Sequence, residues 1–220
     1  LASLFLNPAR CGKLVSVQTV EAVMTRSLLA TMILFSSTIW AMPEDGSQYS
    51  LLDEINADNV TSLEPIFTYH TGDFSHGFKS KGHTFQATPV YRDGRLYVST
   101  SSNLVLAVDA GTGKEIWRFD PKLERDIDYS ESASRGVAIW QGDAEHCPLR
   151  IFHGTLNGEL YALNAETGEP CTDFGSDGRI DLGIGIRNRR LGDYSVTSPV
   201  AVLDDRIIVG SAVGDNGAVD

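Results

Sequence analysis

The sequence predicts an all-β fold made of consecutive β-propeller blades, and two observations lead to this prediction. The first is an internal repeat: Arg95–Thr100 and Ala107–Gly113 recur 55 residues later, without a gap, as Arg150–Thr155 and Ala162–Gly168. A third copy begins at Arg206, and repeats of this length are typical of propellers and other repeat arrays. The second is the local pattern, in which short β-rich runs alternate with turn residues and no 3.6-residue periodicity is found. This pattern excludes a solenoid of helix pairs and favours four-stranded antiparallel blades.

The first copy of the repeat places four strands in order. The runs rich in β-branched, aromatic and aliphatic residues are Val90-Tyr91, Arg95–Thr100, Leu104–Val108 and Lys114–Phe119. Asp93-Gly94 and the glycine-containing segment Asp109–Gly113 separate these runs and are expected to form turns. Outside the repeats, only the short stretch Asn56–Leu63 is expected to be helical.

The amino-terminal region carries a predicted export signal. Met24-Thr25-Arg26-Ser27 is a short basic head, the apolar run Leu28–Trp40 follows it, and Ala41 is a small residue at its end. This order is typical of a secretory signal peptide, and the run is too short for a bilayer, which takes about 20 residues to span. An ordinary buried helix is the alternative. We expect three parts: a non-native or untranslated upstream segment at 1–23, a signal peptide at 24–41, and a truncated propeller at 42–220.

The charge balance limits the classes of partner. The chain has 29 acidic and 18 basic side chains, and its formal net charge is −11. Nucleic-acid binding depends on Lys and Arg neutralising phosphates, so we expect no nucleic-acid partner. Hydrophobic residues make up 42% of the chain and charged residues 21%, which is ordinary for a folded globular protein and excludes a wholly disordered one.

Two cysteines are expected to form a disulfide. Cys11 lies upstream of the expected start, which leaves Cys147 and Cys171. An even pair in an exported protein is most simply a disulfide, and two free thiols are the alternative. A metal site has little support, because neither cysteine belongs to a CxxC motif or accompanies an HxxxH spacing.

One motif resembles a known family. Ala107-x-Asp109-x-x-Thr112-Gly113-Lys114-Glu115-x-Trp117 is similar to the tryptophan-docking motif of the quinoprotein dehydrogenases that use pyrroloquinoline quinone (PQQ). Further similar segments follow in the same order, among them Thr68–Asp73, Arg135–Ala138, Cys147–Phe152, Cys171–Gly175 and Thr197–Pro199. The resemblance runs from about Gln48 to the last residue and points to the branch with glucose and quinate dehydrogenases. It implies an eight-bladed β-propeller of which about the first three blades are present.

Two features depart from the family pattern. The second copy of the repeat has Thr172 where the first has Trp117, so its docking contact is expected to be missing or replaced by the neighbouring Cys171 bridge. Upstream of Arg135, where some relatives place vicinal cysteines or a histidine against the cofactor, this chain has Ser130-Glu131-Ser132-Ala133. The resemblance therefore does not imply a disulfide platform under the cofactor ring.

The resemblance also implies cofactor-binding residues. Arg135 matches an arginine that contacts the quinone oxygens, and a guanidinium offers fixed donors to such oxygens. Gln86 matches a position facing a PQQ carboxylate, to which an amide can donate. Thr197 matches a hydroxyl that contacts PQQ. The structural alternatives are a solvated surface arginine, a turn or strand-end glutamine and a strand-start threonine.

A divalent cation is implied beside PQQ. Asp215 and Asn216 match the pair that binds it, and a carboxylate with an amide carbonyl provides the hard oxygen ligands that suit Ca²⁺. A turn after a strand is the alternative for the same two residues. The catalytic base is expected beyond residue 220, so the sequence names no catalytic residue.

Two functions from different classes fit these features. The first is a periplasmic PQQ-dependent dehydrogenase that oxidises an alcohol, sugar or polyol and passes electrons to a quinone or a cytochrome, with peripheral association to the inner membrane left open. The second is a non-catalytic propeller of similar repeats that serves as an envelope scaffold or assembly factor. The docking motif is common to both, whereas Arg135 and the pair Asp215 and Asn216 favour the enzyme, because a scaffold needs no quinone or cation ligands.

Overall fold

The computed structural model describes residues 4–6, 53–73, 84–127, 129, 131–143, 145–186, 190–204 and 206–213. The chain divides into two compact units, one being Leu14–Pro65 and the other combining Leu1–Lys13 with Ile66–Asp220. The first unit contributes a short 3₁₀ helix, η1 (Val60–Ser62), within the stretch expected to be helical. In the part of the chain that the structure describes, no helix has the length and apolar character to span a membrane.

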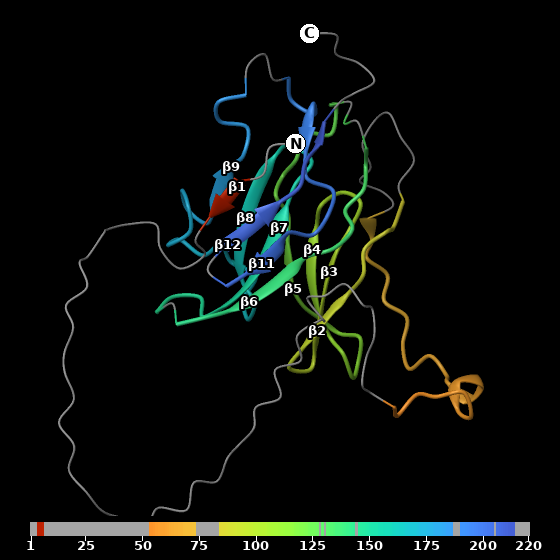
Figure 1. Ribbon diagram of the computed structural model, residues 1–220. Coiled ribbons are helices and arrows are strands. Elements are labelled where there is room, and N and C mark those ends of the chain that lie inside the picture. Colours follow the sequence, from red (N-terminus) through yellow and green to blue (C-terminus); the bar gives the residue numbers. More distant parts are fainter. Residues whose placement is uncertain are drawn as a thin grey trace, which may run out of the picture. The chain divides into compact units, whose positions relative to one another are not determined.

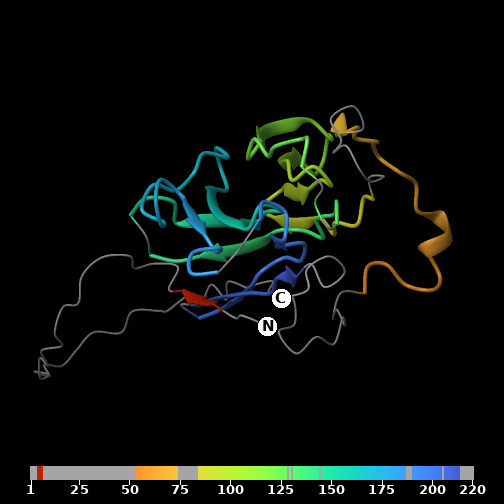
Figure 2. The same cartoon turned by 90° about the horizontal axis from the view of Figure 1, so that it is seen from above.

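The second unit contains two complete four-stranded antiparallel sheets and the start of a third (Figures 1 and 2). The first sheet is β2 (Val90–Arg92), β3 (Arg95–Ser99), β4 (Val105–Asp109) and β5 (Glu115–Phe119). The second sheet is β6 (Ala138–Gln141), β7 (Leu149–Gly154), β8 (Glu159–Asn164) and β9 (Arg179–Asp181). The third begins with β11 (Ala201–Leu203) and β12 (Arg206–Val209). We call these sheets blades 1, 2 and 3, and they confirm the predicted all-β propeller architecture.

The turns of blade 1 follow from its sequence. Asp93 and Gly94 both have positive φ, at 48° and 77°, which is the backbone of a tight hairpin turn whose twist suits the flanking strands β2 and β3. Between β4 and β5, the Asp109 carboxylate accepts hydrogen bonds from the N–H groups of Gly111 and Thr112, at 3.1 and 2.8 Å. Gly113 then takes a positive φ of 71°, and this glycine completes the turn.

The open edge of blade 3 carries a strand from the amino-terminal region. β1 (Leu4–Leu6) pairs antiparallel with β12, on the side opposite β11. In blades 1 and 2, the third strand (β4 and β8) occupies the place that β1 takes in blade 3. A separate two-stranded pair, β10 (Tyr194–Ser195) with β13 (Ala212–Val213), flanks this blade. An unpaired strand edge readily accepts another strand, which accounts for the pairing of β1.

Along each strand, successive side chains point to opposite faces of the sheet, so the two faces of a blade contact different neighbours. One core lies between blades 1 and 2 and includes Tyr97, Val105, Ala107, Trp117, Ile151, Tyr161 and Leu163. A second core lies between blades 2 and 3 and includes Phe152, Leu160, Ala162, Phe174, Val196, Ile207 and Val209. The outward-turned residues of blade 1 form a smaller cluster of Ala87, Val98, Leu106 and Val108, against which Tyr69 packs.

Trp117 fastens blade 1 to blade 2, as predicted. Its indole N–H donates to the carbonyl of Ala165 at 3.0 Å, and the same carbonyl accepts from the Tyr97 hydroxyl at 3.1 Å. The Trp117 ring lies over Gly168, where an added Cβ would stand 2.6 Å from the indole carbons. Only glycine leaves room for the ring at this point.

Candidate functional site

Backbone hydrogen bonds join the segments that precede the first strand of each blade. Thr88 of blade 1 donates its N–H to the carbonyl of Arg135 at 3.3 Å, and the N–H of Arg135 donates to the carbonyl of Thr197 at 2.8 Å. Gly136 has a φ of 144°, and a Cβ there would stand 3.4 Å from the Thr88 carbonyl oxygen. That contact is an ordinary one, so the positive φ and not the space favours glycine here. The hydrogen bonds hold Arg135 between blades 1 and 3.

The structure brings two of the predicted cofactor residues together. The guanidinium of Arg135 donates from Nη1 to the hydroxyl of Thr197 at 2.7 Å, although 62 residues separate them in sequence. It also donates from Nη2 to the carboxylate of Glu131 at 2.5 Å. The side chains of Arg135 and Glu131 remain 36% and 40% exposed, so the guanidinium is oriented by two partners and still accessible to a ligand.

Glu131 was not predicted as a site residue. It lies four residues before Arg135, but that spacing brings side chains together only on a helix, and residues 131–137 are not helical. The contact arises because the segment folds back toward Thr197 before entering β6. No signal in the sequence would have identified it.

Gln86 is not joined to this pair. Its side-chain amide donates to the hydroxyl of Thr84 at 3.1 Å, and the residue is exposed. It lies two residues before Thr88 on the segment that meets Arg135, so its cofactor role stays a prediction.

Asp215 and Asn216, the predicted cation ligands, lie outside the described residues. Among the described residues, no group of three or more His, Cys, Asp or Glu side chains could hold a metal ion.

Buried hydroxyl groups lie on the same segments. Ser134, next to Arg135, shares a hydrogen bond of 2.7 Å with Ser99 at the end of β3. Ser132 and Ser195 are also buried, and their hydroxyl oxygens have no hydrogen-bond partner within the described part of the chain. Buried hydroxyl groups are rarely left without a partner, so these two are exceptions within the described part of the chain.

A second buried polar group connects blades 1 and 2. Asn103, with a positive φ of 65°, accepts a hydrogen bond at its side-chain oxygen from the N–H of Leu156, at 2.7 Å. His153 on β7 is fully buried, and neither of its ring nitrogens has a hydrogen-bond partner within the described part. Burial lowers the pKa of His153 to about 4, and the nearby backbone of Asn103 offsets this only in part. The imidazole is therefore neutral at neutral pH.

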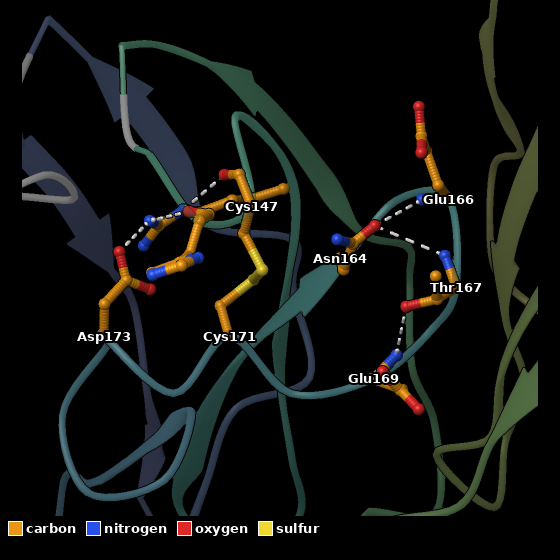
Figure 3. Close-up of a disulfide and its surroundings, with 9 residues drawn as sticks. Cys147, Asn164, Glu166, Thr167, Glu169, Cys171 and Asp173 are labelled. Atoms are coloured by element: carbon orange, nitrogen blue, oxygen red, sulfur yellow. Dashed lines mark hydrogen bonds and ion pairs between the residues drawn. A yellow bond between two sulfur atoms is a disulfide. The ribbon is translucent and has the colours of Figure 1, made fainter.

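The predicted disulfide is confirmed and closes blade 2 (Figure 3). Cys147 and Cys171 are bonded with their Cα atoms 5.9 Å apart, within the usual range for a disulfide. Arg150 is fully buried beside the bond and donates to the carbonyl of Cys147 at 3.0 Å and to the carboxylate of Asp173 at 2.5 Å. Thr172 is exposed, so it makes no docking contact of the kind that Trp117 makes.

Comparison with known proteins identifies relatives of most of the chain. The family model for the PQQ glucose/ethanol/alcohol dehydrogenase β-propeller domain matches residues 38–220. Quinoprotein glucose dehydrogenase A of Acinetobacter calcoaceticus is 33% identical over 186 residues, which cover 78% of this chain and 23% of the relative. The quinate/shikimate dehydrogenase (quinone) of Acinetobacter baylyi is 32% identical over 193 residues, which cover 80% and 24%. The chain thus spans about a quarter of the length of these curated relatives.

Solved structures agree with the fold. The quinohemoprotein alcohol dehydrogenase of Comamonas testosteroni is 30% identical, and the match covers 75% of this chain and 21% of that one with a TM-score of 0.58. A europium-containing methanol dehydrogenase, at 21% identity and a TM-score of 0.52, shares the fold. With a family model that matches most of its residues, the chain belongs to the PQQ glucose/ethanol/alcohol dehydrogenase β-propeller family.

Proposed function

We propose that this chain is part of a PQQ-dependent dehydrogenase that oxidises an alcohol, a sugar or a polyol. The observation that carries the proposal is the convergence of Arg135 and Thr197 from different blades, joined by both a backbone and a side-chain hydrogen bond. A non-catalytic propeller would need no accessible guanidinium held in one orientation at this point.

The residues present fit PQQ, a flat tricarboxylate with an ortho-quinone. Arg135 has N–H donors beyond the two bound by Thr197 and Glu131, and a guanidinium binds carboxylate and quinone oxygens through such donors. When bound, PQQ supplies the quinone that accepts two electrons from the substrate.

Within this site, the chain's own residues bind and orient. Thr197 accepts one hydrogen bond from Arg135 and fixes the guanidinium plane, while Glu131 balances its charge from the other side. Gln86 belongs to the proposal as a donor to a cofactor carboxylate. The base that removes the substrate's hydroxyl proton is assigned to a part of the protein outside these 220 residues.

The proposal includes a divalent cation, a cellular location and an electron acceptor. Asp215 and Asn216 would hold Ca²⁺ or another divalent ion through their oxygens. The signal-peptide pattern at 24–41 supports export to the periplasm. A quinone or a cytochrome would accept the electrons, and peripheral association of the protein with the inner membrane would bring it to such an acceptor.

Direct measurement of PQQ binding by the full-length protein tests the proposal. We expect Arg135→Ala to weaken PQQ binding by about 10- to 100-fold, because a hydrogen bond to a charged group contributes about 1.5–3 kcal/mol. Equilibrium dialysis with PQQ at a fixed Ca²⁺ concentration reads out the affinity without requiring turnover. Arg179→Ala is the matched control, because the exposed Arg179 on β9 pairs with Glu159 on β8 rather than with a residue of the Arg135 segment.

Two results would contradict the proposal. A wild-type protein that binds no PQQ in the presence of Ca²⁺ would favour the scaffold alternative. Unchanged affinity in Arg135→Ala would make this arginine structural.

Asp215→Ala is expected to raise the Ca²⁺ concentration needed for PQQ-dependent dye reduction, whereas Arg135→Ala should leave that concentration nearly unchanged.

A further inference from the structure

Glu131 is presented to Arg135 by a stretch of backbone that is held in place. The residues around it in the chain are buried, namely Tyr129, Ser132, Ala133 and Ser134. Arg135 is fixed at its backbone, because it accepts a hydrogen bond from the N–H of Thr88 and donates one to the carbonyl of Thr197. The carboxylate and the guanidinium therefore face each other from fixed positions, unlike two long side chains that meet on a free surface.

The ion pair occupies part of the Arg135 guanidinium. An arginine side chain has five N–H donors, and Arg135 gives one on Nη1 to Thr197 at 2.7 Å and one on Nη2 to Glu131 at 2.5 Å. Within the described part of the chain, Glu131 is the only acidic side chain that pairs with it. A carboxylate is among the acceptors that a guanidinium binds most strongly, so Glu131 makes the kind of contact that a carboxylate ligand would make.

This contact is one that a ligand can displace. The side chains of Arg135 and Glu131 are both more than a third exposed. Ion pairs with this much exposure are weak and are screened by salt, whereas breaking a fully buried pair would leave an unpaired charge in the interior. The pair can therefore form in the empty site and yield to a ligand that binds the same guanidinium.

The charges of the two side chains also cancel. An anion that approaches Arg135 is attracted by the guanidinium and repelled by the carboxylate of Glu131, which lies beside it. At a partly exposed site, one unit charge a few ångströms away changes the affinity for an anion by about tenfold. PQQ is a tricarboxylate, so the negative charge of Glu131 acts against its binding.

We propose that Glu131 is an intramolecular competitor for the ligand of Arg135. In the protein without cofactor, its carboxylate positions the guanidinium. When an oxygen of PQQ binds, the ligand takes over part of this contact, and the affinity is lower than the arginine alone would give. The identity of the ligand rests on the proposed function, whereas the contact between Glu131 and Arg135 in the empty site does not.

Glu131→Gln in the full-length protein tests the effect on PQQ. Glutamine keeps an oxygen that can accept from Arg135 but removes the charge. We expect about tenfold tighter PQQ binding in equilibrium dialysis, and we expect this gain to shrink at high salt. Glu166→Gln is the matched control, because it removes the same charge from an exposed residue in the turn after β8 and should leave the affinity unchanged.

Three results of the dialysis would overturn the proposal. The first is an unchanged affinity in Glu131→Gln, and the second is an equal gain in Glu166→Gln. The third is weaker PQQ binding in Glu131→Gln. If raised Ca²⁺ restored that binding, the carboxylate would belong to the cation site, and if it did not, the carboxylate would be required to orient Arg135 for the cofactor.

A chemical probe tests the contact without PQQ. Phenylglyoxal modifies arginine side chains and reacts slowly with a guanidinium that a carboxylate holds. In full-length protein prepared without PQQ, we expect Arg135 to be modified several-fold faster in Glu131→Gln than in the wild type, as measured by mass spectrometry of its peptide. Arg179, which pairs with Glu159, is the internal reference and should react equally in both proteins.

The probe separates this proposal from the proposed function. Equal modification rates of Arg135 in Glu131→Gln and the wild type would overturn the competition, whatever the affinity for PQQ. Faster modification in a protein that binds no PQQ would contradict the proposed function and would still support competition at Arg135.

Discussion

The junction between blades 1 and 2 and the junction between blades 2 and 3 are stabilised by different side chains. Blade 1 is fastened to blade 2 by Trp117, whose indole is buried and hydrogen-bonded to Ala165. At the corresponding place in blade 2, Thr172 is exposed, and the adjacent Cys171 is buried and bonded to Cys147. The first junction depends on buried area and one hydrogen bond, whereas blade 2 depends in addition on a covalent bond that restricts the unfolded chain.

The difference shows that the repeats share their backbone fold more closely than the side chains that pack between blades. The four-stranded order is the same in both blades, but the core between blades 2 and 3 contains Phe174, whose ring packs on that of Phe152 of the same blade with centroids 5.5 Å apart. This core is therefore built from other groups, and no tryptophan is among its described buried residues. The consequence is that the two junctions should respond to different perturbations.

Trp117→Ala should have the largest effect. Removing a buried tryptophan leaves a cavity against Gly168 and the Ala165 carbonyl without its indole donor, so we expect a loss of about 3–5 kcal/mol in the free energy of unfolding. Chemical denaturation of the full-length protein measures it. Ile116→Ala, at an exposed neighbour on β5, is the control and should cost little. A loss below 1 kcal/mol would show that the docking contact is not what holds this junction.

Replacing both Cys147 and Cys171 by Ser should cost slightly less. The bond closes a loop with a sequence separation of 24, and the chain-entropy model gives about 3 kcal/mol for such a loop. Reducing agent should destabilise the wild type but not the double variant. Combined with Trp117→Ala, the losses should add, because Trp117 belongs to the core between blades 1 and 2 and Cys171 to the core between blades 2 and 3. An identical response of both proteins to reductant would contradict this account.

His153→Val should make the protein less sensitive to acid. His153 occupies the position on β7 that Val98 occupies on β3, so the change introduces the residue of blade 1 into blade 2. Its folded pKa of about 4 lies below the ordinary histidine pKa of 6.5, so between these values the unfolded state binds a proton that the folded state does not. Stability is therefore lost as pH falls through this window, by about 2 kcal/mol between pH 7 and pH 5. Thermal midpoints at both pH values measure it, and equal acid shifts in variant and wild type would refute the prediction.

Glu115→Gln should have the smallest effect. Glu115 pairs with Arg118 at 2.8 Å, and both side chains are about a third exposed. Exposed ion pairs of this kind contribute at most about 1 kcal/mol, so the change in unfolding free energy should stay below that value and shrink further in high salt. Denaturation at low and high ionic strength measures both. A loss comparable to that of Trp117→Ala would mean that the contacts of Glu115 with Arg118 and Tyr69 contribute as much to the stability of blade 1 as the docked tryptophan.

Much of the fold was predictable because it depends on local patterns. The local pattern placed the four strands of blade 1 and the Asp93-Gly94 turn, and the 55-residue repeat placed β7 and β8 of blade 2. The docking role of Trp117 followed from the family resemblance. The positions of β6 and β9 were not predicted, because neither lies at the repeat distance from its counterpart in blade 1. The disulfide was predictable because only two cysteines remained once Cys11 was set aside. The pairing of β1 with β12 was not predicted, because an open strand edge accepts a short apolar segment without any specific sequence signal.

The sequence by itself determined the blade architecture and named Arg135 and Thr197, because strand periodicity and motif order are properties of neighbouring residues. Only the tertiary structure decided that these two residues touch, that Glu131 joins them, and that Gln86 stands apart. The physical reason is the rotation from one blade to the next, which sets distances between segments about sixty residues apart. The same rotation places Phe67 on Gly113 as Trp117 is placed on Gly168, a correspondence that no spacing in the sequence contains.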